Sequence, residues 1–195
     1  MKRSEIKQLS TQKWVPILRE KSADFLCNLI KQSQPKTILE IGTCLGYSGT
    51  LMLSIAPYAH LTTVEIDTNS FMQAQKIFAD EGVLDRATLI NDDAMNVITD
   101  LARQQKKFDL IFLDGPKGQY FKYLPYFKSM LNLGGYLVAD DVLFHGYVKQ
   151  ENVGHKHRTI VNSLKNYLAD LDADPSFSHE LIEMEDGLSV AQKNI

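Results

Sequence analysis

The chain alternates short β-branched or apolar runs with amphipathic helical patterns, and this alternation restricts its possible folds more than any other feature. Five runs have the length and composition of buried strands, at residues 37–41, 61–65, 87–90, 108–114 and 136–139. Helical patterns occupy residues 22–31, 46–55, 69–81, 94–105 and 120–131, and a turn is expected at Gly134-Gly135. Strands that alternate with helices in this way pair in parallel. The pattern predicts an α/β fold.

The C-terminal part of the chain predicts a different ending for this sheet. A long amphipathic stretch over residues 156–171 is followed by two weaker strands, at 178–184 and 188–192. Asp186-Gly187 between them is a hairpin signal. We therefore expect a doubly wound sheet that is mostly parallel and ends in an antiparallel hairpin. A length of 195 residues favours a single domain, 1–195, with an N-terminal helical segment (1–34) and a sheet core (35–195).

Composition excludes several classes of protein. With 44% hydrophobic and 23% charged residues, the chain is neither disordered nor collagen-like, and a net charge of −3 argues against a generally basic nucleic-acid coat. Apolar runs are broken within a few residues, so we expect no membrane span and no secretion signal. The two cysteines, Cys27 and Cys44, form no disulfide framework, which favours the reducing cytoplasm.

Six basic residues lie within the first 21 residues of the chain. They could contact an anion such as RNA, or simply form a solvated helix face.

A glycine-containing loop follows the first predicted strand. Gly42 and Gly46 allow a tight turn and a close approach of the backbone to a ligand, although a purely structural turn is the alternative. The loop lacks both the lysine of a phosphate-binding loop and the GxGxxG spacing, so a nucleoside without a polyphosphate suits it better than ATP or NAD. Glu65 ends the next strand, 23 residues after Gly42, where a carboxylate can accept the hydroxyls of a ribose or remain an exposed charge. Asp93-Ala94 could line an adenine, or Asp93 could cap a helix.

Three aspartates end the last two parallel strands, which we expect to be neighbours. Asp114, Asp140 and Asp141 would repel one another without a cation, and carboxylate oxygens suit Mg²⁺, Mn²⁺ or Ca²⁺. The alternative is a pair of aspartates that cap a turn. Lys117, three residues after Asp114, is a candidate base because a nearby metal cation would lower its pKa. The alternative for Lys117 is a solvated loop lysine.

The segments EIGTCLGYSG, TTVEID, DGPKGQY and DDVLFHG together resemble the cation-dependent O-methyltransferases, a family that includes caffeoyl-CoA and catechol enzymes. The resemblance spans roughly residues 15–193. It implies a class I methyltransferase (Rossmann-like) fold, S-adenosylmethionine (SAM) as the cofactor, and Mg²⁺ (or Mn²⁺ or Ca²⁺) held by Asp114, Asp140 and Asp141. It assigns catalysis to Lys117 and Asp114. The positions that it assigns to cofactor binding are Leu18, Glu40, Gly42, Gly46, Ser48, Glu65, Asp93, Ala94 and Asp114.

The amino-acid residues of these segments are most similar to those of a bacterial branch of the family that methylates 5-hydroxyuridine in tRNA. The resemblance therefore favours tRNA as the acceptor, with a small phenolic molecule as the alternative, and implies a homodimer as the assembly. Basic residues that could supply an approach for RNA are Lys149, Lys156, Arg158 and Lys165. Two departures stand out: Asp141 occupies a position where the family usually has asparagine, and the front of the chain is short. A non-catalytic RNA- or nucleoside-binding module is the alternative of another class.

Overall fold

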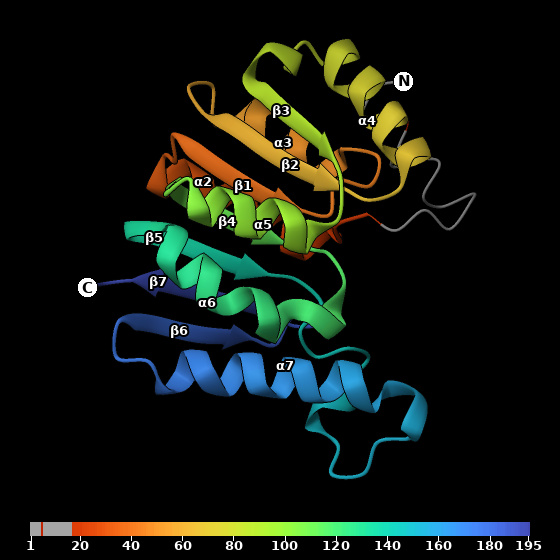
Figure 1. Ribbon diagram of the computed structural model, residues 1–195, viewed down its shortest axis with the longest axis vertical. Coiled ribbons are helices and arrows are strands. Elements are labelled where there is room, and N and C mark those ends of the chain that lie inside the picture. Colours follow the sequence, from red (N-terminus) through yellow and green to blue (C-terminus); the bar gives the residue numbers. More distant parts are fainter. Residues whose placement is uncertain (1–4, 6–16) are drawn as a thin grey trace. The chain divides into compact units, whose positions relative to one another are not determined.

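The structure is a computed structural model, and it describes residue 5 and residues 17–195. Contacts within the chain group it into two compact units, Met1–Val97 and Ile98–Ile195. Within the predicted N-terminal helical segment, the described part contains one complete helix, α2 (Glu20–Ser33) (Figure 1). Four of the six basic residues near the N-terminus, Lys2, Arg3, Lys7 and Lys13, lie outside the described residues.

The first unit is built on three parallel strands in the order β3-β2-β1. The strands are β1 (Thr37–Ile41), β2 (His60–Glu65) and β3 (Ala87–Asn91), and the helices after α2 are α3 (Tyr47–Ile55), α4 (Thr68–Asp80) and the short η1 (Leu84–Arg86). In the strand register Glu40 lies beside Thr63, and Glu65 lies beside Asn91. The arrowheads of the three strands therefore point the same way in Figure 1, and their carboxyl ends form one edge.

The helices of this unit form where the sequence places apolar residues at helical spacing. On α2 the buried side chains include Leu26, Leu29 and Ile30, while α4 buries Ala74, Ile77 and Phe78. The helix α2 ends at a left-handed residue, Gln34, immediately before a proline that cannot continue it. Both helices are therefore amphipathic, as the sequence pattern predicts.

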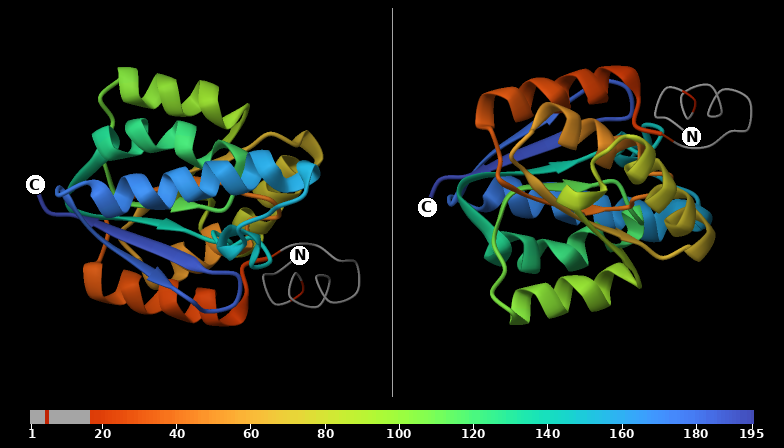
Figure 2. Two further views of the ribbon diagram at one scale, coloured as in Figure 1. Left: turned by 90° about the horizontal axis from the view of Figure 1, so that it is seen from below. Right: turned by 90° about the horizontal axis from the view of Figure 1, so that it is seen from above.

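The second unit contains four strands in the order β4-β5-β7-β6. The helix α5 (Ala94–Arg103) leads into it, and its own elements are β4 (Phe108–Leu113), η2 (Lys117–Gln119), α6 (Tyr120–Met130), β5 (Leu131–Ala139), η3 (Tyr147–Lys149), α7 (His155–Ala173), β6 (Phe177–Ile182) and β7 (Leu188–Lys193). The strands β4 and β5 are parallel, as predicted, whereas β7 is antiparallel to both β5 and β6. Figure 2 shows α6 and α7 side by side along these strands. The predicted α/β class, mostly parallel with an antiparallel C-terminal hairpin, is confirmed.

The prediction of a turn at Gly134-Gly135, with the strand beginning at Tyr136, is wrong. The strand β5 already starts at Leu131 and runs through both glycines. Phe108 pairs with Leu131 but Leu110 pairs with Tyr136, so β5 carries extra residues that bulge out of the pairing. The glycines accommodate this bulge instead of reversing the chain.

The buried core of each unit is formed by large apolar and aromatic side chains. Phe78, Ile38 and Met52 are fully buried in the first unit, and Tyr120 and Tyr167 are fully buried in the second. No helix in the described part of the chain combines the length and apolar character needed to cross a bilayer.

Candidate active site

The site residues predicted from the sequence fall into two groups, one in each unit. Except for Leu18, which precedes α2, the first group lies at the carboxyl ends of β1, β2 and β3, and the second follows the carboxyl ends of β4 and β5. In an open α/β sheet, ligands bind outside the carboxyl ends of the strands. The location of both groups therefore fits ligand binding.

Glu40, at the end of β1, is fully buried beneath the glycine-containing loop. Its carboxylate accepts a hydrogen bond from the Ser48 hydroxyl at the start of α3 and another, of 2.6 Å, from the Thr63 hydroxyl on β2. A buried charge without partners would be costly, and these hydroxyls supply partners. Glu40 thus braces the loop from below, and its predicted contact with the cofactor stays a prediction.

The loop between β1 and α3 is anchored to β2 through its backbone. The N–H groups of Gly42 and Thr43 donate to the Val64 carbonyl over 3.0 and 3.1 Å. Gly46 caps α3 with a φ of +81°, and a Cβ there would lie 2.6 Å from the Phe78 ring. Only glycine satisfies both the left-handed backbone and this close packing. The loop conformation is therefore built into the fold of the first unit.

Glu65, at the end of β2, is held in a defined orientation. One carboxylate oxygen accepts from the Cys44 N–H over 2.7 Å, and the other accepts from the Asp67 N–H over 2.9 Å. The neighbouring Asn91 side chain donates to the carbonyls of Glu65 and Ile66 and so secures this strand end. Each carboxylate oxygen has a second lone pair, so Glu65 can still accept from a ligand hydroxyl.

The remaining residues of the first group differ in their accessibility. Asp93 is exposed and accepts from the Met95 N–H over 2.8 Å, which is the helix-capping geometry that the sequence left open. Ala94 follows it and is half-buried, whereas Leu18 is buried. The capping role of Asp93 is compatible with an additional contact to a base, because its other oxygen is available for hydrogen bonding at the surface.

The second group is an acidic cluster at the ends of β4 and β5. Asp114, Asp140 and Asp141 each place one carboxylate oxygen so that all three oxygens lie within 4.8 Å of one another. Asp140 is buried, while the side chains of Asp114 and Asp141 are each 24% exposed. The strands β4 and β5 are neighbours, and the Asp140 N–H donates to the Leu113 carbonyl over 3.0 Å. The fold therefore brings the three predicted ligands together.

Lys117 points its ammonium group into this cluster. Its Nζ lies 3.0 Å from Asp114 Oδ1 and 3.2 Å from Asp141 Oδ2. Burial lowers the pKa of Lys117, but the charges of Asp114 and Asp141 outweigh burial and raise the pKa above its ordinary value. The lysine is thus a charged partner of the cluster rather than a solvated loop residue.

Tyr120, at the start of α6, supports the cluster from inside the unit. Its hydroxyl is buried and lies 3.2 Å from the Leu113 carbonyl and 3.3 Å from the Asp140 carbonyl. Burial, followed by the nearby carboxylates, raises the pKa of Tyr120 well above its ordinary value, so the hydroxyl keeps its proton. This hydrogen-bond donor lies at the two strand ends that carry the aspartates.

Sequence reasoning missed several residues that shape the two groups. Thr63 looks like an ordinary β-branched strand residue, and Tyr120 looks like the first residue of an amphipathic helix. Asp186 was assigned only to a hairpin turn, yet its carboxylate accepts from the His145 N–H in the loop that follows Asp141. Nothing in local sequence spacing indicates these contacts, since each joins segments far apart in the chain.

The chain is similar to known O-methyltransferases. A family model described as O-methyltransferase matches residues 3–194. The catechol O-methyltransferase of Niastella koreensis is 29% identical over 86% of this chain and 77% of its own length. The caffeoyl-CoA O-methyltransferase of Stellaria longipes is also 29% identical, over 65% of this chain and 54% of its own length.

Solved structures show the same fold. The O-methyltransferase TomG from Streptomyces achromogenes, involved in tomaymycin synthesis and solved in complex with SAM, has a TM-score of 0.89 and 22% identity, covering 99% of this chain and 89% of its own. This similarity confirms the predicted methyltransferase fold. Because the family model matches nearly the whole chain, the protein belongs to the O-methyltransferase family.

Proposed function

We propose that this O-methyltransferase uses SAM and a divalent cation to methylate a hydroxyl that lies beside a second oxygen. The observation that carries the proposal is the convergence of three carboxylates and Lys117 at the ends of β4 and β5. The SAM complex of TomG, which has the same fold, supports the choice of cofactor.

The acidic cluster fits a hard divalent cation. It offers three carboxylate oxygens within 4.8 Å of one another, and oxygen is the ligand that Mg²⁺, Mn²⁺ and Ca²⁺ prefer. Lys117 pairs with two of these carboxylates, Asp114 and Asp141, and the third, Asp140, is buried beside them. Asp114, Asp140 and Asp141 would hold the ion. When bound, it would lower the pKa of the acceptor hydroxyl and fix the orientation of the two acceptor oxygens.

Lys117 would accept the proton that leaves the acceptor hydroxyl. Its pKa is raised by Asp114 and Asp141, which are two of the proposed ligands. Once a bound cation balances the charges of Asp114 and Asp141, burial is the remaining influence on the lysine. Burial lowers the pKa of Lys117. A lysine in this position is suited to act as a general base.

The first unit would bind the cofactor, whose sulfonium group supplies the methyl. Glu65, with its carboxylate fixed by two backbone N–H groups, would accept the ribose hydroxyls. The braced loop from Glu40 to Ser48 would hold the amino-acid end, and Asp93-Ala94 would border the adenine.

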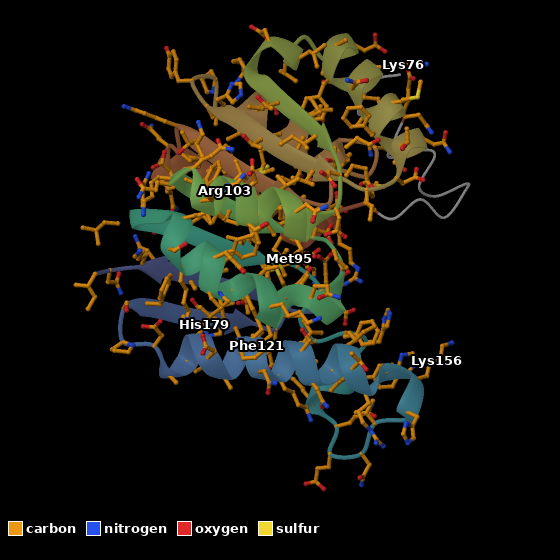
Figure 3. The ribbon with its side chains drawn as sticks, in the orientation of Figure 1. Lys76, Met95, Arg103, Phe121, Lys156 and His179 are labelled. Carbon is orange, nitrogen blue, oxygen red and sulfur yellow. The ribbon has the colours of Figure 1, made fainter. Side chains whose placement is uncertain are left out.

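For the acceptor, we propose 5-hydroxyuridine in tRNA, in which the 5-hydroxyl lies beside the 4-carbonyl. The surface that follows Asp141 supports this choice. Tyr147 and His157 are half-buried and stack with ring centroids 4.8 Å apart, and Lys156 and Arg158 are exposed on the first turn of α7. Figure 3 shows Lys156 projecting from that end of the helix. Rings that stack on bases and cations that contact phosphates are typical of surfaces that bind single-stranded RNA.

The other predicted cations contribute less to this surface. Lys149 pairs with Glu183, and Lys165 donates to the Gln150 carbonyl over 2.9 Å. A small catechol-type acceptor is the second candidate, and the names of the relatives favour it. Such an acceptor also offers two adjacent oxygens, so the acidic cluster serves either one.

A competition experiment decides between the acceptors. The protein is incubated with labelled SAM and Mg²⁺ in the presence of hypomodified tRNA, catechol and caffeoyl-CoA. We expect the label in tRNA, and labelling of only the small phenols would exclude the tRNA assignment. The double variant Lys156→Ala/Arg158→Ala should reduce labelling of tRNA but not of catechol. Lys122→Ala, an exposed lysine on α6, is the matched control.

We further propose a cytoplasmic location, which the cysteine content favours, and a homodimer, which the family resemblance implies. Analytical ultracentrifugation of the full chain tests the dimer, with a single species at the monomer mass of 22.1 kDa as the contradicting result.

A further inference from the structure

The backbone that follows Asp141 adopts an unusual conformation. Asp141, Phe144 and His145 have φ values of +58°, +45° and +56°, in a region that residues other than glycine rarely adopt. Such a conformation persists only where surrounding contacts enforce it. The contacts that enforce it here are therefore of interest for the orientation of the Asp141 side chain.

Those contacts come from the turn between β6 and β7, more than forty residues later in the chain. The Val142 N–H donates to the Gly187 carbonyl over 3.0 Å, and the Leu143 N–H donates to the Asp186 carbonyl over 2.8 Å. The Asp186 carboxylate accepts from the His145 N–H over 2.6 Å. Three of the four residues after Asp141 are thus held by two residues of one turn.

The turn is itself fixed within the unit. Asp186 is 7% exposed, and β7 pairs with β5 up to Ala139, the residue before Asp140. Gly187 has a φ of +84°, and a Cβ there would lie 2.4 Å from Leu143 Cγ. The turn therefore packs directly against the loop, with no space for a side chain at Gly187.

We propose that the Asp186-Gly187 turn positions Asp141 for cation binding by holding the strained backbone that follows it. Asp186 is a positioning residue in this view, because its carboxylate binds the loop N–H and not the reacting groups. The inference rests on the proposed function, since it concerns the ion that Asp114, Asp140 and Asp141 would hold. Without the turn, the loop would relax toward ordinary φ values and Asp141 would leave the cluster.

The test is the affinity of the full chain for Mn²⁺, measured by calorimetry without SAM or acceptor. Asp186→Ala removes the acceptor for the His145 N–H, and Asp186→Glu keeps the charge but displaces the oxygen by one methylene. Both should weaken Mn²⁺ binding about 10–100-fold, the usual effect of losing a partner that orients a metal ligand. Asp186→Asn keeps an oxygen in place and should bind Mn²⁺ like the unaltered protein.

Asp174→Ala is the matched control. Asp174 also accepts from a backbone N–H, that of Ser176, but at the opposite end of β6. It should leave Mn²⁺ affinity unchanged even where the melting temperature falls. The inference would be overturned if Asp186→Glu bound Mn²⁺ normally and Asp186→Asn bound it weakly. Mn²⁺ affinity would then follow the charge at position 186, which is a general electrostatic effect. These two variants decide the question even if Asp186→Ala does not fold.

A second pair of variants tests the packing of the turn. Gly187→Ala should weaken Mn²⁺ binding because its Cβ would displace Leu143. Gly134→Ala has a similar positive φ of +78° but no atom within 4 Å, so it controls for backbone strain alone. Equal Mn²⁺ affinity in Gly187→Ala and Gly134→Ala would contradict the role of the turn. An unaltered protein that binds no Mn²⁺ would instead refute the proposed metal site, and this inference with it.

Discussion

Two lysines in the second unit each lie between two aspartates, and their surroundings differ in one decisive respect. Lys117 lies between Asp114 and Asp141, and Lys128 on α6 lies between Asp170 and Asp174 near the end of α7. Lys128 also lies over the Phe177 ring, 5.7 Å from its centroid. It ties α6 to α7 and β6, and no third carboxylate is grouped with it among the described residues.

Lys117 likewise has two aspartate partners, and in addition the buried Asp140 lies beside them. One ammonium group between two partly exposed carboxylates gives a modest surface ion pair, whereas three carboxylates that converge repel one another and favour a cation between them. The proposed cation site thus differs from the Lys128 bridge by a third, buried acid.

The largest expected effect follows removal of the divalent cation. Dialysis against a chelator should reduce methyl transfer to the rate without enzyme, and Mg²⁺ or Mn²⁺ should restore it, because the acidic cluster alone cannot activate an acceptor. Labelled methyl transfer measures this. SAM affinity, measured separately, should persist, and full activity in the presence of chelator would refute the cation site.

Replacement of Lys117 by alanine gives the next largest effect on activity. Lys117→Ala should lower kcat about 10²–10⁴-fold, the usual contribution of general acid–base catalysis, with SAM affinity retained. Lys128→Ala, the control with the same kind of partners, should leave kcat unchanged. Equal losses of kcat in the two variants would erase the distinction between the two clusters.

The loss of stability expected on removing the charge of Lys128 is smaller. Lys128→Met keeps most of the aliphatic stem but removes the charge, and it should lower the free energy of unfolding by about 1 kcal/mol, as expected for a partly exposed ion pair. Urea denaturation followed by circular dichroism measures the change, with Lys122→Met on the same helix as the control. A variant as stable as the unaltered protein would show that this bridge is not stabilising.

The smallest effect concerns pH. Hydrogen bonds from Lys128 and Ser176 lower the pKa of Asp174 from 3.8 to about 2 in the folded chain. Its contribution to stability is therefore fully present above pH 3.8 and is lost as the pH falls toward 2. Asp174→Asn should flatten the fall in unfolding free energy over this range relative to the unaltered protein. Parallel pH profiles for the two proteins would contradict the shift.

Much of the candidate site could be read from the sequence because it depends on local signals. A strand rich in apolar residues that ends in an acid is visible in the chain, as at Glu65 and Asp114. In a parallel α/β sheet such ends share an edge, so the convergence of Asp114 with Asp140 and Asp141 follows from the strand pattern. The bulge in β5 was missed, because two adjacent glycines indicate a turn as strongly as they indicate a bulge.

Contacts between distant segments could not be read in the same way. The brace from Thr63 to Glu40 joins two strands, and its hydroxyl has no spacing that marks it out. His179 on β6, labelled in Figure 3, bonds Asp172 on α7 and Ser189 on β7, and this triad likewise has no sequence signature. Such partners depend on strand register, which side-chain periodicity alone does not specify.

The amino-acid sequence by itself determined the α/β class, the parallel strands with their antiparallel ending, and the acids at the strand ends, because these follow from periodicity and residue type. Only the tertiary structure decided which partners surround each of those acids. Glu40 is buried against two hydroxyls, while Asp114 and Asp141 pair with Lys117 beside the buried Asp140. The physical reason is that the free-energy cost of burying a carboxylate depends on its hydrogen-bond and charge partners. Those partners come from distant parts of the chain.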